Sequence, residues 1–143
     1  MATTTVDFEK QFAELGLGEG WKWDKGSWWL EPAEPMDVRA VAQKMLALEG
    51  RFVAITATER PDHEIRLDYQ WDLNGNLLSF VAATTDNKKI ASIVDLSPGA
   101  DWAERETYEY FAVEFTGRAT LEPLMLRAGQ DVGVHLHKEE AAQ

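Results

Sequence analysis

The segment that decides the fold spans residues 65–83 and reads IRLDYQWDLNGNLLSFVAA. Its first nine residues alternate strictly between apolar and polar side chains, which is the period of a half-buried β-strand. Asn74-Gly75 then supplies the two positions of positive φ that a type I′ turn requires. Alternation and turn agree on one antiparallel register, with the apolar residues of both arms on one side. The predicted facing pairs are Leu73–Asn76, Trp71–Leu78, Tyr69–Phe80 and Leu67–Ala82.

The segments on both sides of this hairpin carry the local signals of helices and further strands. Gly16 and Gly50 stand where helix C-caps are expected, and Ser97-Pro98 is a typical helix start. The predicted elements are a helix over 6–15, a short hairpin over 21–30, a helix over 37–49, strands over 52–58 and 90–96, and a helix over 100–112. This order indicates an α+β fold, with a mainly antiparallel sheet and helices packed on one face.

The length of the chain fits one domain. Its 143 residues lie within the usual size of a single domain and can bury enough apolar surface to fold without a metal or disulfide. Beyond residue 115, several glycines and Pro123 indicate irregular structure that ends in a polar tail. We expect a single α+β domain over residues 1–126 and an irregular C-terminal tail over residues 127–143.

Composition and charge exclude several classes of protein. With 14 basic and 25 acidic residues the net charge is −11, so binding to nucleic acid or to an anionic membrane surface is not expected. The absence of cysteine removes disulfides, cysteine-ligated metal centres and thiol nucleophiles. No window approaches the ~20 apolar residues of a membrane helix, and the start lacks the features of a signal peptide. A soluble, cytoplasmic chain is therefore expected.

A search for catalytic or metal-binding residues yields little. His135 and His137 would share one side of an extended strand, but no Asp or Cys at ligand spacing accompanies them. His63 follows a Pro-Asp pair in a turn and is expected at the surface. The sequence contains no Gly-rich phosphate loop and no nucleophile elbow. We therefore assign no catalytic, cofactor-binding or metal-ligating residue to this chain.

The predicted helix over 100–112 has an unusual distribution of charged and aromatic residues. Asp101 and Glu109 each lie four residues from Arg105, so its guanidinium is expected between two carboxylates. The aromatic residues of this helix do not form a single stripe. Two interpretations stay open at this point. Either the helix is held between its own domain and a partner, or it is a solvated helix with weak surface ion pairs.

The six tryptophans present the same choice. Four of them crowd into residues 21–29, and a small domain can hardly bury all four. Tryptophan is enriched at the energetic centres of protein interfaces, so some of these residues are candidates for contact with a partner. The alternative is that they cover an edge of the sheet.

Residues 89–126 carry a pattern of acidic, apolar and glycine positions that is typical of one protein family. The matching positions are Pro98-Gly99-Ala100, Trp102, Glu104-Arg105-Glu106, Glu109, Phe111, Gly117, Leu124 and Met125. In order and spacing they resemble the signature of the thirty-kilodalton subunit family of respiratory complex I. The same family supplies a soluble subunit to the membrane-bound, energy-converting nickel–iron (NiFe) hydrogenases of the Ech type.

The chain departs from the family pattern at several positions. Tyr110 and Ala112 replace an apolar residue and a glycine, and Arg118 stands where the family has histidine. Glu122 replaces a basic residue or proline. The longer, basic C-terminal segment of the complex I members has no counterpart in residues 127–143. By these criteria the chain looks more like the hydrogenase subunit than the complex I subunit.

The resemblance implies a non-catalytic assembly subunit of an energy-converting NiFe hydrogenase, docked on the large catalytic subunit in the cytoplasmic arm. The chain would hold no cofactor, and its partners would carry the NiFe centre and iron–sulfur clusters. It would lie on the cytoplasmic side of the membrane, peripheral through partner subunits. The residues expected at the partner interface are Glu104, Arg105, Glu106, Glu109, Phe111, Gly117 and Arg118.

Three alternatives remain. Within the same family, the chain would be the thirty-kilodalton-type subunit of NADH:quinone oxidoreductase (complex I), docked on a large subunit of the forty-nine-kilodalton type. From another class, it would be an independent small-molecule enzyme with Glu104, Glu106 and Glu109 as acid/base candidates. The third alternative is a free-standing binding module that uses the tryptophans of residues 21–29.

Overall fold

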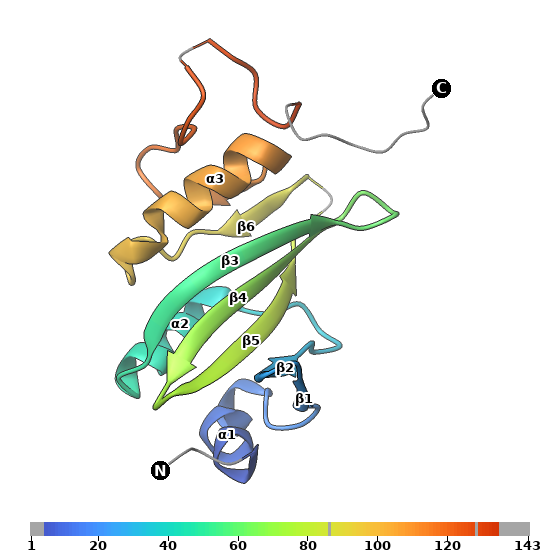
Figure 1. Ribbon diagram of the computed structural model, residues 1–143, viewed down its shortest axis with the longest axis vertical. Coiled ribbons are helices and arrows are strands. Elements are labelled where there is room, and N and C mark those ends of the chain that lie inside the picture. Colours follow the sequence, from blue (N-terminus) through green and yellow to red (C-terminus); the bar gives the residue numbers. More distant parts are fainter. Residues whose placement is uncertain (1–4, 86, 128, 135–143) are drawn as a thin grey trace.

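The computed structural model describes residues 5–85, 87–127 and 129–134. In chain order its elements are α1 (Thr5–Phe12), η1 (Ala13–Leu15), β1 (Lys22–Asp24), β2 (Ser27–Leu30), α2 (Val38–Ala47), β3 (Arg51–Glu59), β4 (Ile65–Leu73), β5 (Asn76–Ala83), β6 (Lys89–Ala91), η2 (Pro98–Ala100), α3 (Asp101–Phe111) and β7 (Glu114–Thr116). Figure 1 shows a curved sheet with α2 behind it, and with α1 and α3 at opposite ends of the molecule.

The hairpin of β4 and β5 lies at the centre of the structure. Asn74 and Gly75 form its turn with φ angles of 52° and 86°, as the sequence predicts. All four predicted facing pairs are present, from Leu73–Asn76 at the turn to Leu67–Ala82 at the open end. The apolar side of the hairpin is buried and holds the largest core side chains. Among them are Leu67, Tyr69, Trp71, Leu78 and Phe80.

The remaining strands extend this hairpin into a five-stranded sheet of order β1-β2-β5-β4-β3. β3 pairs antiparallel with β4, and β1 pairs antiparallel with β2. The single parallel pairing in this sheet joins β2 to β5. The predicted α+β fold with a mainly antiparallel sheet is therefore confirmed. β3 forms one edge of the sheet, and α3 packs against that strand.

Helices α1 and α2 pack on the apolar face of the sheet. α2 begins at an Asp37 cap, whose Oδ1 accepts hydrogen bonds from the amides of Arg39 and Ala40, both at 3.1 Å. Its inward residues are Val38, Val41, Ala42 and Met45. From α1, the Phe12 ring lies 5.3 Å from that of Phe80 in an edge-to-face contact. These contacts join the helices to the central hairpin.

The C-terminal half differs from the sequence prediction in its strands. The strand expected over 90–96 is limited to β6, because the chain turns at Ser92 to reach the side chain of Glu104. A further strand, β7, pairs in parallel with β6. Three residues in parallel pairing leave no local period in the sequence, so this strand was not predicted.

The turn of the central hairpin offers a test of the register. We expect Gly75→Ala to lower the free energy of unfolding by about 1–2 kcal/mol, because its φ of 86° is costly for a residue with a Cβ. Gly99→Ala is the matched control, since neither glycine has an atom within 4 Å of the added Cβ and Gly99 lacks a positive φ. Urea unfolding measures both variants. Equal effects would contradict a turn-specific constraint.

Candidate docking site

Helix α3 turns polar side chains toward the interior. It follows the single turn η2, which begins at Pro98, and it ends at Ala112 in the left-handed conformation with φ of 58°. The buried residues of the helix are Glu104, Thr107 and Glu109. An amphipathic helix normally buries an apolar stripe, so the buried carboxylates need partners inside the chain.

The carboxylate of Glu104 is fully buried and accepts three hydrogen bonds. Ser92 Oγ donates to Oε1 at 2.6 Å, and the backbone amide of Ile93 donates to Oε2 at 2.8 Å. Arg118 Nη1 donates to Oε1 at 3.0 Å. The donors come from the turn after β6 and from the segment after β7. Glu104 therefore joins three segments through one side chain.

Arg118 completes this network from the other side. Its side chain is only 9 % exposed, and its second terminal nitrogen donates to Asp101 at the start of α3. Its Nε donates to the carbonyl oxygen of Thr120 at 2.5 Å. One guanidinium thus pairs with two carboxylates of α3 and also donates to the backbone two residues further along the chain, which is the planar, multidentate geometry that arginine favours.

Arg39 extends the network to α2. Its Nη1 donates to the carbonyl oxygen of Ser92 at 2.7 Å, the same residue whose hydroxyl donates to Glu104. It also forms a two-pronged pair with Asp95, with distances of 2.6 and 2.9 Å. The turn after β6 is therefore fixed on both sides, by α2 and by α3.

The network has clear consequences for two ionisable groups. Burial raises the pKa of Glu104 above its ordinary value, while the bonds from Ser92, Ile93 and Arg118 act in the opposite direction. Burial also raises the pKa of Tyr69 well above its ordinary value, and the charge of Glu104 adds to that effect. Tyr69 Oη is buried without a hydrogen-bond partner among the described residues. The charge of Glu104 is balanced by the guanidinium of Arg118, which contacts it directly.

A second set of contacts fixes the chain that crosses α3, residues 117–134 with the gap at 128, here called the overlying segment. Glu109 Oε1 accepts hydrogen bonds from the amides of Met125 and Leu126 at 2.6 and 2.8 Å. The amide of Gly133 donates to the carbonyl oxygen of Glu109 at 2.8 Å. Figure 1 shows this segment looping over the outer side of α3.

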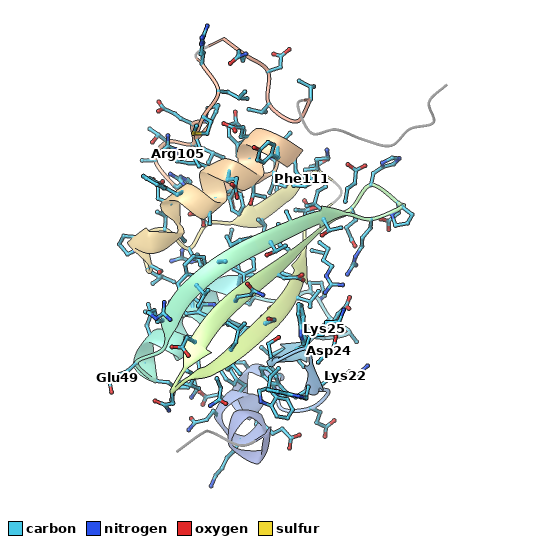
Figure 2. All side chains as sticks on the ribbon, viewed as in Figure 1. Lys22, Asp24, Lys25, Glu49, Arg105 and Phe111 are labelled. Carbon is cyan, nitrogen blue, oxygen red and sulfur yellow. The ribbon has the colours of Figure 1, made fainter. Side chains whose placement is uncertain are left out.

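Arg105 holds the same segment nearer the start of the helix. Its Nε donates to the Glu122 carbonyl oxygen at 3.2 Å, and its Nη2 to that of Pro123 at 3.0 Å. Its Nη1 lies 3.5 Å from Asp101, as the sequence predicts. The second predicted pair is wrong, because Glu109 is directed to the backbone of the overlying segment instead. Figure 2 shows Arg105 on the side of α3 that the overlying segment crosses.

The residues expected at a partner interface thus fall into two groups. Glu104, Glu109 and Arg118 are internal, and they support the helix and the overlying segment. The others reach the surface to different degrees. Arg105 is 25 % exposed, Phe111 is half-buried, Glu106 is exposed, and Gly117 adopts a φ of 88° with open space around it. Of the three carboxylates considered as acid/base candidates, only Glu106 faces solvent in this structure.

The most exposed large apolar side chains also lie in this region. Among the described residues they are Met125 (79 %), Trp102 (69 %) and Val134 (66 %). Trp102 belongs to α3, and the other two belong to the overlying segment. The sequence indicated Trp102 because the aromatic residues of this helix do not form a single apolar stripe. Nothing in the local sequence identified Met125 or Val134, because their exposure depends on how the segment crosses α3.

The other candidates from the sequence lie elsewhere. His63 is exposed and pairs with Glu59 at 2.8 Å, whereas His135 and His137 lie outside the described residues. The described residues contain no group of three or more acidic, histidine or cysteine side chains suited to a metal ion. No helix in this part of the chain is long and apolar enough to cross a membrane. Of the clustered tryptophans, Trp21 is buried and Trp23 is 59 % exposed.

Fold and site together define an α+β module in which the charged helix α3 binds other segments of its own chain, and in which α3 and the overlying segment carry the three most exposed large apolar side chains of the described residues. A family model described as "Respiratory-chain NADH dehydrogenase, 30 Kd subunit" matches residues 32–141. The chain therefore belongs to the family of the thirty-kilodalton subunit of the respiratory-chain NADH dehydrogenase.

Individual relatives in this family show which enzyme's subunits the chain is similar to. The chain is similar to the C subunit of NADH-quinone oxidoreductase from Rhodopseudomonas palustris, 32% identical over 88 residues that cover 57% of this chain and 44% of the relative. The corresponding protein of Sinorhizobium medicae is 29% identical over 92 residues, covering 62% and 45%. The C/D 2 subunit of Aquifex aeolicus is 32% identical over 83 residues, covering 56% and 14%.

These relatives favour the complex I alternative over the hydrogenase expectation. All three carry the name of a subunit of NADH-quinone oxidoreductase. The chain spans less than half the length of these curated relatives. The Arg118 departure, one basis of the hydrogenase expectation, has an internal role as the partner of Glu104.

The buried network predicts a pH-dependent loss of stability. We expect Arg118→Ala to lower the free energy of unfolding by about 3–5 kcal/mol at neutral pH, because Glu104 would stay buried without a cation. The pKa of Glu104 would then rise further above its unfolded value. The loss is therefore largest above the folded pKa and shrinks as the pH falls through it, so it should be smaller at about pH 5 than at about pH 7.5.

Urea unfolding at the two pH values measures this effect, with two controls. Arg51→Ala removes a surface guanidinium that lies 3.5 Å from Asp72 and outside the network, so its effect should be much smaller than that of Arg118→Ala and equal at both pH values. Arg118→Lys keeps a positive charge and should recover part of the loss. A loss for Arg118→Ala that is independent of pH would contradict the role given to Glu104.

The carboxylate of Glu109 is expected to hold the overlying segment. In Glu109→Ala the amides of Met125 and Leu126 lose their acceptor, so their hydrogen exchange should accelerate by roughly tenfold or more, equivalent to about 1–3 kcal/mol. Glu106→Ala removes an exposed carboxylate of the same helix and should leave both amides unchanged. Unaltered protection in Glu109→Ala would show that other contacts hold the segment.

Proposed function

We propose that the chain is a non-catalytic docking subunit of a complex I-type NADH:quinone oxidoreductase. Family membership and the similarity to the C subunits of this enzyme support the proposal. As a subunit of an oxidoreductase complex, it would contribute contacts to partner subunits rather than residues to the reaction. The division into a domain over 1–126 and a tail over 127–143 stays a prediction.

One observation carries this proposal: α3 and the overlying segment form a hydrogen-bonded platform that carries the three most exposed large apolar side chains of the described residues. The charges of Glu104, Arg118 and Glu109 are satisfied within the chain, so the platform exists before any partner binds. Preformed surfaces bind without the entropic cost of ordering. On this platform, Trp102 and Met125 are the side chains that would gain most from burial, and tryptophan is typical of interface centres.

The partner we propose is the large subunit of the complex, of the forty-nine-kilodalton type, which the name of one relative supports. The Aquifex protein is named for both C and D, and the match covers only 14% of its length. A polypeptide named for both subunits is consistent with C-type and D-type regions that lie side by side. In the assembled complex, this chain would lie on the cytoplasmic side of the membrane, held through its partners, and the partners would carry the iron–sulfur clusters.

Substitution of the exposed side chains tests the docking face. We expect Trp102→Ala combined with Met125→Ala to leave the free energy of unfolding within about 0.5 kcal/mol, because both side chains are exposed. The same variant should weaken assembly by about 2 kcal/mol or more. Trp23→Ala, which removes an exposed indole from β1, is the matched control and should assemble normally.

Affinity purification of the N-terminally tagged chain from gently solubilised membranes provides the measurement. We expect the large partner subunit to co-purify, together with iron–sulfur, flavin and quinone-reductase subunits. Nickel in the purified complex would instead assign the chain to an energy-converting NiFe hydrogenase. Recovery of the chain alone, or equal assembly of the double variant and wild type, would overturn the proposed docking face.

A further inference from the structure

A hollow of about 740 Å³ is lined by segments other than α3 and the overlying segment. One wall is the turn that follows η1, residues 15–20, and the other is residues 30–41, which lead from β2 into α2. Figure 1 shows the second wall running from β2 back to α2 behind the sheet. The larger aliphatic residues that line the hollow are Leu15, Leu17, Leu30, Met36 and Val41.

The rim of this hollow is acidic. Four acidic residues border it, and no Lys or Arg does. Two of them already have partners, since Glu31 pairs with Arg60 at 2.8 Å and Asp37 caps α2. Glu19 and Glu34 are both exposed, and neither has an ion-pair or hydrogen-bond partner among the described residues. Two carboxylates on opposite walls are therefore available to a ligand.

The wall over residues 31–36 is rigid and rich in acceptors. Pro32 and Pro35 fix the backbone φ angle and lack an N–H group, so this wall has two fewer backbone donors than backbone acceptors. A wall of this kind is organised before binding, which lowers the entropic cost of association. Its chemistry favours a ligand that brings hydrogen-bond donors.

The apolar floor, the acidic rim and the acceptor-rich wall together indicate which class of ligand fits the hollow. An anionic ligand or anionic lipid would be repelled by the two carboxylates and by the net charge of −11. A neutral apolar molecule would leave both carboxylates partly desolvated and unpaired. A polypeptide segment with an apolar side chain between Lys or Arg residues satisfies all three features, because long basic side chains reach acidic rims while the anchor fills the floor.

We propose that this hollow is a docking site for a polypeptide segment in which an apolar anchor is flanked by basic residues. The site is separate from α3 and does not depend on the function proposed for that helix. One of its walls, residues 15–20, lies outside residues 32–141, the part matched by the family model. The partner in this case is a second polypeptide with a cationic, apolar segment.

Short synthetic peptides test the proposal with the full 143-residue chain. The first peptide has two leucines flanked by lysines, the second replaces the leucines by serine, and the third replaces the lysines by glutamate. We expect only the first to bind measurably by fluorescence anisotropy at about physiological ionic strength, where distant charges are screened. Its binding should shift the NMR signals of residues 15–20 and 31–41.

Two charge-matched double variants test whether the first peptide binds in the hollow. Glu19→Gln with Glu34→Gln should weaken binding of the first peptide by about fivefold to tenfold. Asp24→Asn with Glu49→Gln removes the same charge from exposed positions outside the hollow, labelled in Figure 2, and should change affinity by less than about twofold. Met36→Ala should also weaken binding several-fold, because the anchor loses an apolar contact.

Three outcomes would overturn the proposal. Equal binding of the serine peptide would show that charge alone attracts the ligand. Equal losses in the two double variants would show that the net charge, not this rim, is responsible. Failure of the first peptide to bind at millimolar concentration would show that the hollow takes no such segment. None of these results would bear on assembly through α3, which is measured in the purified complex.

Discussion

The C-terminal half of this protein depends on one buried carboxylate. A charge without water must be paired and hydrogen-bonded to be tolerated, and Glu104 finds its donors in Ser92, Ile93 and Arg118. These donors lie 12 and 11 residues before it and 14 residues after it in the chain. Satisfying one side chain therefore places the turn after β6, the helix α3 and the overlying segment relative to one another. An apolar residue could fill the same volume, but it would not specify which three segments meet.

The same interaction explains why a charged motif can be characteristic of a subunit to which no catalytic residue is assigned. In Glu104-Arg105-Glu106, the first carboxylate is internal, the arginine binds the carbonyl oxygens of the overlying segment, and only the second carboxylate is exposed. The motif thus supports the segments that carry the surface, and only one of its three side chains is exposed. In the proposed complex, contact would fall to side chains such as Trp102, which the motif positions but does not include.

The central hairpin gives the molecule a rigid middle with two different ends. At one end, β3 supports α3 and the platform with its exposed apolar side chains. At the other, β2 leads into residues 30–41, which border the acidic hollow together with residues 15–20. A subunit of this kind could connect two partners without any chemistry of its own.

Local signals in the sequence were sufficient for the β4–β5 hairpin and its register, because strict alternation and the Asn74-Gly75 turn act within a few residues. They likewise located α2 and α3, and the spacing of residues 89–126 indicated the family. Tertiary structure alone decided the partners of the two buried carboxylates of α3, Glu104 and Glu109. The spacing of Arg105 and Glu109 permits a helical ion pair, yet Glu109 binds amides 16 and 17 residues away. Spacing in the sequence shows which side chains can meet within one helix. Burial decides which carboxylates must find hydrogen-bond partners. Burial depends on how distant segments pack, and the local pattern of the helix does not contain that information.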